Sequence, residues 1–165
     1  MADPVKSQNR AASRSAARIA AVQALYQMDM TGIDLTDVIA EFEAHRLGKE
    51  IEDCQYGEAE SAFFRDLVTG VVREQLEIDP LIDQQLAEGW RLPRVDSILR
   101  AILRAGVYEL MFRDDVPARV VITEYVDIAH AFFAGDEPKV VNGLLDKLGH
   151  KTRPDKFAAQ GSEDG

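Results

Sequence analysis

The amino-acid sequence predicts an all-α fold, built as a single domain of about seven helices. Apolar side chains recur at the three- and four-residue spacing of a helix along most of the chain. Alternating β-branched runs, which would indicate strands, are missing. With 165 residues, 46% of them hydrophobic, the chain is long enough to bury one core without disulfides or a structural metal.

Four helices are predicted in the amino-terminal half. The first ends before Gly32, because glycine adopts the left-handed conformation that closes many helices. The fourth is short and starts near Asp79, a favourable N-cap followed by Pro80 at the first helical position. An acidic connection separates the second helix from the third. The predicted helices start between residues 7 and 13 and at about 35, 58 and 79, and they end near residues 30, 46, 76 and 89.

Three more helices are predicted in the carboxyl-terminal half, at about 95–113, 119–133 and 136–149. The first of these has a broad apolar face, which indicates a central, heavily packed element. The second contains Val120, Val121 and Ile122, but β-branched residues cost a helix only about 0.5 kcal/mol each. No repeat or linker divides the chain. We therefore expect a basic, partly flexible arm (1–12), one helical domain (13–150) and a frayed tail (151–165).

Composition argues against a membrane-spanning protein. The most apolar region, residues 98–112, carries Arg100, Arg104 and Glu109, so no uncharged stretch is long enough to cross a bilayer. The first 20 residues lack the apolar core of a secretory signal, although arginine and serine among alanines also fit an organellar transit peptide. The single Cys54 cannot form an internal disulfide, which favours a reducing compartment. We expect a cytoplasmic protein.

Signatures of enzymatic chemistry are not found in the sequence. The eleven glycines form no G-x-G-x-x-G loop, and the stretch 143–149 has the wrong spacing for a phosphate loop and fits a helix C-cap. Asp127 and His130 have the spacing of half a carboxylate-bridged metal site, but the second half is missing. Cys54 lies among carboxylates, which disfavour a reactive thiolate. The sequence therefore predicts no catalytic residue, no metal ligand and no cofactor.

Positive charge is concentrated at the amino end. The net charge of the chain is −10, unlike that of a typical basic nucleic-acid-binding domain, yet residues 1–18 contain four cations against one carboxylate. Lys6, Arg10, Arg14 and Arg18 recur every four residues, so in a helix they follow one slowly drifting face. Guanidinium groups pair with phosphate oxygens and stack on unpaired bases, so this face fits RNA. The alternative is a charged arm that is merely solvated.

Several segments of the chain carry motifs that occur together in one known family. In order and spacing they resemble the NusB family of transcription antitermination factors, over roughly residues 14–150. The segments are Arg18–Tyr26, Phe64–Val71, Ile102–Leu110, Asp115–Pro117 with the following Thr123-Glu124 helix, and Val140–Leu148.

This resemblance implies seven helices in two subbundles, without catalytic activity. It implies binding to the boxA element of ribosomal RNA leader transcripts, and no DNA binding is expected. It also implies pairing with NusE, a small-subunit ribosomal protein, and loading onto RNA polymerase with the other Nus factors.

The resemblance further implies a set of RNA-binding residues. The family's arginine-rich segment falls on Arg10, Arg14 and Arg18, and its first-helix glutamine falls on Gln23. Its helix-five arginine, the aromatic ending helix six and the acidic loop residue fall on Arg104, Phe132 and Asp136. Lys139 is added from the sequence and not from the resemblance, because it belongs to a second basic group that could join the amino-terminal cations if the carboxyl end folds back beside them. Val140 stands where the family has a second RNA-side aromatic, which implies greater dependence on NusE.

Two other functions stay open. A protein-only helical adapter or homodimer would use the apolar and acidic faces for partners, and the basic arm would only solubilise. For the adapter, as for the RNA-binding factor, the acidic segment 41–60 is a candidate partner surface, and the alternative is a solvated loop. An RNA-modification function is suggested because a NusB-like domain also precedes the catalytic domain of a ribosomal RNA cytosine methyltransferase, but this chain has no Gly-rich cofactor loop.

Overall fold

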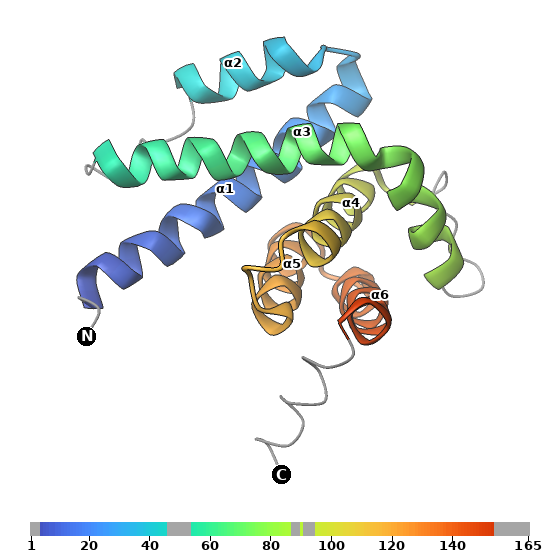
Figure 1. Cartoon of the computed structure of the whole chain (residues 1–165). Coiled ribbons are helices and arrows are strands. Elements are labelled where there is room, and N and C mark those ends of the chain that lie inside the picture. Colours follow the sequence, from blue (N-terminus) through green and yellow to red (C-terminus); the bar gives the residue numbers. More distant parts are fainter. Residues whose placement is uncertain (1–3, 46–53, 87–89, 91–94, 154–165) are drawn as a thin grey trace. The chain divides into compact units, whose positions relative to one another are not determined.

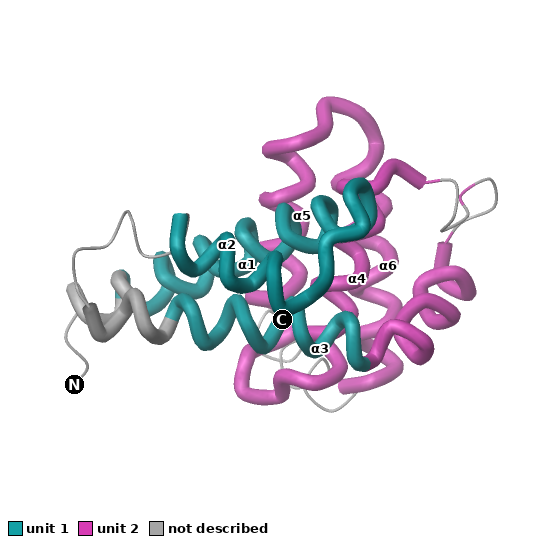
Figure 2. The backbone as a smooth tube through the Cα atoms, turned by 90° about the horizontal axis from the view of Figure 1, so that it is seen from above, with its two compact units in different colours: residues 1–73 teal, residues 74–165 magenta. Residues whose placement is uncertain are grey.

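The structure, a computed structural model, describes residues 4–45, 54–86, 90 and 95–153. In this part of the chain it contains six α-helices and no strand, which confirms the all-α prediction (Figure 1). The helices are α1 (Pro4–Thr31), α2 (Leu35–His45), α3 (Cys54–Gln85), α4 (Ser97–Phe112), α5 (Ala118–Phe132) and α6 (Glu137–Thr152). The chain forms two compact units, residues 1–73 and 74–165, and the boundary between them lies within α3 (Figure 2).

The first unit contains α1, α2 and the first part of α3. Small side chains, among them Ala17, Ala21 and Ala24, form much of the buried side of α1 and allow neighbouring elements to approach closely. Phe42 on α2 and Phe64 on α3 are fully buried and stack with their ring centroids 5.4 Å apart. This aromatic pair joins α2 to α3.

The end of α1 follows the predicted glycine signal. Gly32 has a φ of +73°, and its N–H donates a hydrogen bond of 3.0 Å to the carbonyl of Met28. A left-handed residue directly after a helix satisfies one of the last carbonyls, and glycine adopts that conformation without a Cβ clash. Asp34 then caps α2, because its Oδ1 accepts the N–H of Asp37 at 3.0 Å.

The second unit packs α4, α5 and α6 against one another. Gly106 allows the close approach, since a Cβ at this position would lie 3.1 Å from Cδ1 of Leu145 and 3.4 Å from Cδ2 of Tyr125. The buried Tyr125 hydroxyl donates to Oε1 of Glu109 at 3.0 Å, so this carboxylate has a partner inside the unit. As expected from its broad apolar face, α4 is the most buried helix of this unit.

The prediction of a separate short helix starting at Asp79 is wrong. Helix α3 continues to Gln85, and Pro80 lies inside it. A proline inside a helix removes one main-chain hydrogen bond and costs about 3 kcal/mol. Ile78 and Ile82, one turn apart on either side of the proline, are both fully buried, and each buried isoleucine contributes roughly 1.5–3 kcal/mol. Their burial offsets the cost of the proline.

The predicted start of the first helix and the predicted end of the last also need correction. Helix α1 already begins at Pro4, so most of the predicted arm is helical. Helix α6 passes through Gly149, which we expected to be a C-cap, and continues to Thr152. Lys151 and Thr152, which we expected in the tail, are therefore helical, and residues 154–165 lie outside the described part.

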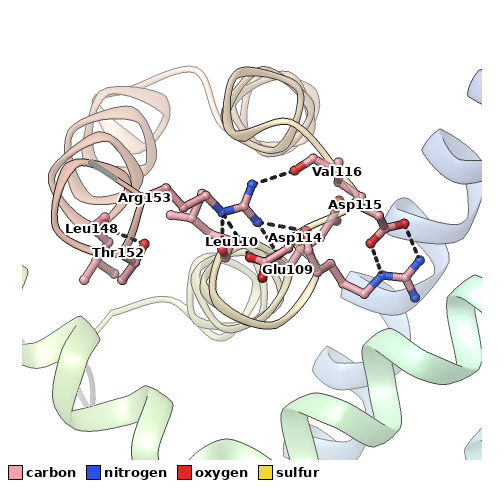
Figure 3. Close-up of polar contacts among 9 residues, drawn as sticks. Glu109, Leu110, Asp114, Asp115, Val116, Leu148, Thr152 and Arg153 are labelled. Carbon is pink, nitrogen blue, oxygen red and sulfur yellow. Dashed lines mark hydrogen bonds and ion pairs between the residues drawn. The ribbon is translucent and has the colours of Figure 1, made fainter. Parts of the chain in front are cut away.

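Arg153, placed by the sequence in the frayed tail, is a buried anchor. Its guanidinium donates to four main-chain carbonyls at the end of α4 and in the turn before α5 (Figure 3). The bonds to Leu110, Val116 and Arg113 measure 2.8, 2.6 and 2.8 Å, and the bond to Glu109 measures 3.3 Å. The carbonyls of Glu109 and Arg113 also accept main-chain N–H groups, from Arg113 and Val116, so Arg153 adds a second donor to these two and joins them to Leu110 and Val116. One side chain thus ties the end of α4 to the turn that follows it.

Candidate nucleic-acid interface

The predicted RNA-binding residues are divided between the two units. The first unit carries Arg10, Arg14, Arg18 and Gln23 on α1. The second unit carries Arg104 on α4, Phe132 at the end of α5, Asp136 before α6 and Lys139 in the first turn of α6.

The arginines of α1 differ strongly in their exposure. Arg10 is exposed, Arg14 is half-buried and Arg18 is only 1% exposed. The expectation that these cations share one solvent-facing stripe is therefore wrong at Arg18. The side chain of Lys6 lies outside the described residues. Burial makes Arg18 poorly suited to meet a phosphate directly, and its predicted RNA contact stays a prediction.

Helix geometry explains the burial of Arg18. A helix advances about 100° per residue, so Arg18 and the buried Leu25 lie only about 20° apart around α1. The arginines thus lie on the same face of α1 as its buried residues. Their side chains reach solvent only toward the start of the helix.

An aromatic ring holds two of these arginines. The Cζ atom of Arg14 lies 5.0 Å from the centroid of the Phe63 ring, and the Cζ atom of Arg18 lies 5.2 Å from it. Both distances are within the range of cation–π attraction, about 6 Å. Phe63 belongs to α3 and was assigned no role from the sequence, where it reads only as an apolar position of a helix.

Gln23 does not lie beside the arginines. Nine residues separate it from Arg14, which places the two about 180° apart around α1. Gln23 instead shares a face with Ile19, Tyr26 and Met30, of which Ile19 is 42% and Met30 is 59% exposed. We call these four residues the outer stripe of α1.

Arg104 is held by a carboxylate on α3. Its Nε and Nη2 donate to Oδ1 and Oδ2 of Asp79, both at 2.9 Å, which is a two-point pair. The Arg104 side chain is only 12% exposed. The sequence suggested a helix cap for Asp79, and only the packing of α3 against α4 shows its actual partner.

Three of the predicted RNA-binding residues lie in or next to the turn between α5 and α6. Phe132 is 39% exposed at the last position of α5, and both Asp136 and Lys139 are exposed. The main-chain carbonyl of Asp136 accepts the N–H groups of Lys139 and Val140 at 3.0 and 3.1 Å, and this contact starts α6. Its carboxylate makes no hydrogen bond to the helix end and is available to a ligand. The turn can therefore offer a ring, a carboxylate and an ammonium group.

The described residues contain neither a metal site nor a membrane span. No three His, Cys, Asp or Glu side chains there come close enough to hold a metal ion. None of the helices in the same ranges has the length and apolar character needed to cross a bilayer. The acidic segment 41–60 falls mostly outside the described side chains. Within it, Glu41 accepts from Gln27, Glu43 pairs with Arg65, and Glu60 is buried.

Comparison with known proteins identifies the family. The model of the NusB family matches residues 15–150. The chain belongs to the NusB family. A transcription antitermination protein NusB from Rhodopseudomonas palustris strain BisB18 is 58% identical over 153 residues, 93% of this chain and 90% of that protein. One from Bradyrhizobium sp. strain BTAi1 is 58% identical over 155 residues, 93% of this chain and 92% of that protein.

Solved structures of NusB proteins share the fold. Thermotoga maritima NusB superposes with a TM-score of 0.72 at 31% identity, over 88% of this chain and 96% of that chain. A chain in the crystal structure of the antitermination factors NusB and NusE in complex with dsRNA gives a TM-score of 0.68 at 28% identity, over 84% of this chain and 97% of that chain. The NusB resemblance seen in the sequence is thereby confirmed.

Proposed function

We propose that this NusB family member is a non-enzymatic transcription antitermination factor that binds boxA-type single-stranded RNA together with NusE. The observation that carries the proposal is its likeness to a chain of the NusB–NusE–dsRNA crystal structure over 84% of its length. We further propose that the complex joins RNA polymerase with other Nus factors in the cytoplasm and acts on ribosomal RNA operons.

The two units supply different kinds of RNA contact in this proposal. Arg10 and Arg14 neutralise phosphates, since their side chains reach solvent at the start of α1. Phosphate neutralisation is blind to sequence, so base recognition needs other groups. Phe132 offers an exposed ring for stacking, and Asp136 and Lys139, within the next seven positions of the chain, offer an acceptor and donors.

Arg104 acts in this proposal as an oriented donor. The pair with Asp79 occupies two of the five guanidinium N–H groups and fixes the plane of the group. A carboxylate beside the guanidinium also offsets its charge. Arg104 therefore contributes hydrogen bonds of fixed orientation to RNA recognition, more than general attraction to phosphate.

We place the NusE contact on the outer stripe of α1. Ile19 and Met30 are large apolar side chains with 42% and 59% exposure, on the side of α1 away from the arginines. A partner bound there leaves Arg10 and Arg14 open to RNA. Exposed apolar side chains that share one face are typical of a protein contact.

Binding to a boxA RNA oligonucleotide and to a shuffled control, with and without NusE, tests the function. We expect tight binding of the boxA sequence only, and tighter binding with NusE present. Equal binding of both sequences, or none, would favour the protein-only adapter or homodimer instead.

Salt dependence tests the phosphate contacts separately. For single-stranded RNA, each neutralised phosphate contributes about −0.7 to the slope of log affinity against log salt. The double variant Arg10→Ala, Arg14→Ala should therefore flatten the slope by about 1.4. Arg65→Ala removes an exposed arginine of the same unit and should leave the slope unchanged. An unchanged slope in the double variant would remove these arginines from the interface.

A further inference from the structure

We infer that Phe63 is a positioning residue for RNA binding: its ring carries the guanidinium groups of Arg14 and Arg18 and pre-orders Arg14 for a phosphate. This inference rests on the proposed RNA-binding function and adds to it a residue from α3 that itself touches no RNA.

The three side chains form one layer within the first unit. Arg14 and Arg18 are one helical turn apart on α1, and their Cζ atoms lie 5.0 and 5.2 Å from the centroid of the same ring. Phe63 is buried, Arg18 is buried and Arg14 is half-buried. The layer therefore runs from the core to the surface, and Arg14 forms its outer end.

Electrostatics explains why a ring is suited to this place. Like charges four residues apart on a helix repel each other. The face of an aromatic ring is negative and attracts both guanidinium groups, and this attraction is stronger where water is excluded. The ring therefore attracts both neighbouring cations and offsets part of their mutual repulsion.

An arginine side chain that is already ordered in the free protein binds a phosphate more tightly. A long exposed side chain loses rotamer freedom when it meets a ligand, and that loss weakens the complex. An arginine already held against a ring loses less. Arg14 should therefore bind a phosphate more tightly than an unsupported arginine at the same position.

The neighbouring ring provides a matched control. Phe64 is also buried, but it stacks on Phe42 instead of on an arginine. Phe63→Leu and Phe64→Leu each remove one buried ring from the same unit. Only the first removes the support of Arg14, so a general loss of packing affects both variants and a positioning effect appears in one.

Fluorescence anisotropy with a labelled boxA-type RNA, in the presence of NusE and over a series of salt concentrations, tests the inference. Phe63→Leu should weaken binding about fivefold at every salt concentration, with an unchanged slope because the charge of Arg14 remains. Phe63→Tyr, which keeps the ring, should bind like the unmodified chain, and so should Phe64→Leu. If Phe63→Leu does not fold, Phe63→Met takes its place.

A double-mutant cycle shows whether Phe63 acts through Arg14. Arg14→Ala should weaken binding and flatten the slope by about 0.7, and adding Phe63→Leu should weaken it no further. In the unmodified chain, NMR should show ring-current shifts of the Arg14 side-chain protons. Phe63→Leu with unchanged affinity, or Arg14 protons without ring-current shifts, would overturn the inference while RNA binding stands. No binding by the unmodified chain would instead overturn the proposed function, and the inference with it.

Discussion

At the scale of single residues, two arginines of the second unit show how a guanidinium that is largely shielded from water finds its partners. Arg153 is surrounded by main-chain carbonyls, whereas Arg104 faces the Asp79 carboxylate. A guanidinium has five donors in a fixed plane and serves both environments. Each pair joins residues that are more than 20 positions apart in the chain. Neither partner was predicted from the sequence, because contacts between distant segments leave no local pattern.

Replacement of Arg153 should destabilise the second unit. We expect Arg153→Met to lower the free energy of unfolding by about 3 kcal/mol, because the buried carbonyls of Leu110 and Val116 lose the guanidinium donor. Urea unfolding followed by circular dichroism measures the change. His150→Ala, at an exposed site on the same helix, should stay within about 0.5 kcal/mol of the unmodified chain. A loss under about 1 kcal/mol for Arg153→Met would contradict the anchoring role.

Removal of the Asp79 charge should affect both stability and RNA binding. Asp79→Asn should lower the free energy of unfolding by about 1 kcal/mol, because Arg104 at 12% exposure keeps its charge without its carboxylate partner. RNA affinity should fall several-fold, since Arg104 is no longer held in one plane. The exposed Asp127, on α5 of the same unit, provides the control, and Asp127→Asn should change neither quantity. Tighter RNA binding by Asp79→Asn would show that the carboxylate competes with RNA instead of orienting Arg104.

At the scale of elements, two glycines should respond in opposite directions to the same substitution. Gly32 has a φ of +73°, so Gly32→Ala should cost about 1 kcal/mol of unfolding free energy. Gly143 lies inside α6 with no heavy atom within 4 Å of an added Cβ, so Gly143→Ala should add about 0.5–1 kcal/mol. Thermal and urea unfolding of the two variants measure both signs. A loss of stability in Gly143→Ala would show a contact at that position.

Several helices were predicted well from the sequence, and the largest error has a clear physical cause. The ends of α2, α4 and α5 agree with prediction within two residues, because caps, turns and apolar periodicity act over a few positions. The break expected at Asp79 relied on a strong local signal, namely a cap followed by proline. The burial of Ile78 and Ile82 outweighs that signal. Burial depends on where other helices lie, and a local pattern does not contain this information.

At the scale of the whole molecule, some features of the candidate interface were predicted from the sequence and others were missed. The four-residue repeat of cations correctly indicates that Arg10, Arg14 and Arg18 share one face of α1. It does not show whether that face is buried, and in the structure Arg18 is. Phe63 and Asp79, which hold the arginines, carry no signal in the sequence beyond that of a core position and a helix cap.

The arginines and the outer stripe lie on different faces of α1, so substitutions on the two faces should affect RNA binding and NusE binding separately. Ile19→Glu combined with Met30→Glu should weaken pairing with NusE at least tenfold, because charges replace exposed apolar side chains. RNA binding by the chain without NusE should be unchanged, since the arginines lie on the other face. Isothermal titration calorimetry with NusE and anisotropy with RNA measure the two quantities. Unchanged affinity for NusE would place the partner on another surface.

The contact of Arg153 also sets an order of events during protein synthesis. The carbonyl of Leu110 is made 43 residues before the side chain that donates to it. At a translation speed of about 5–20 residues per second, roughly two to nine seconds pass before Arg153 is added. Until residue 153 has left the ribosomal exit tunnel, the end of α4 in the nascent chain has no such donor. The second unit therefore gains its full resistance to proteases only after Arg153 has emerged.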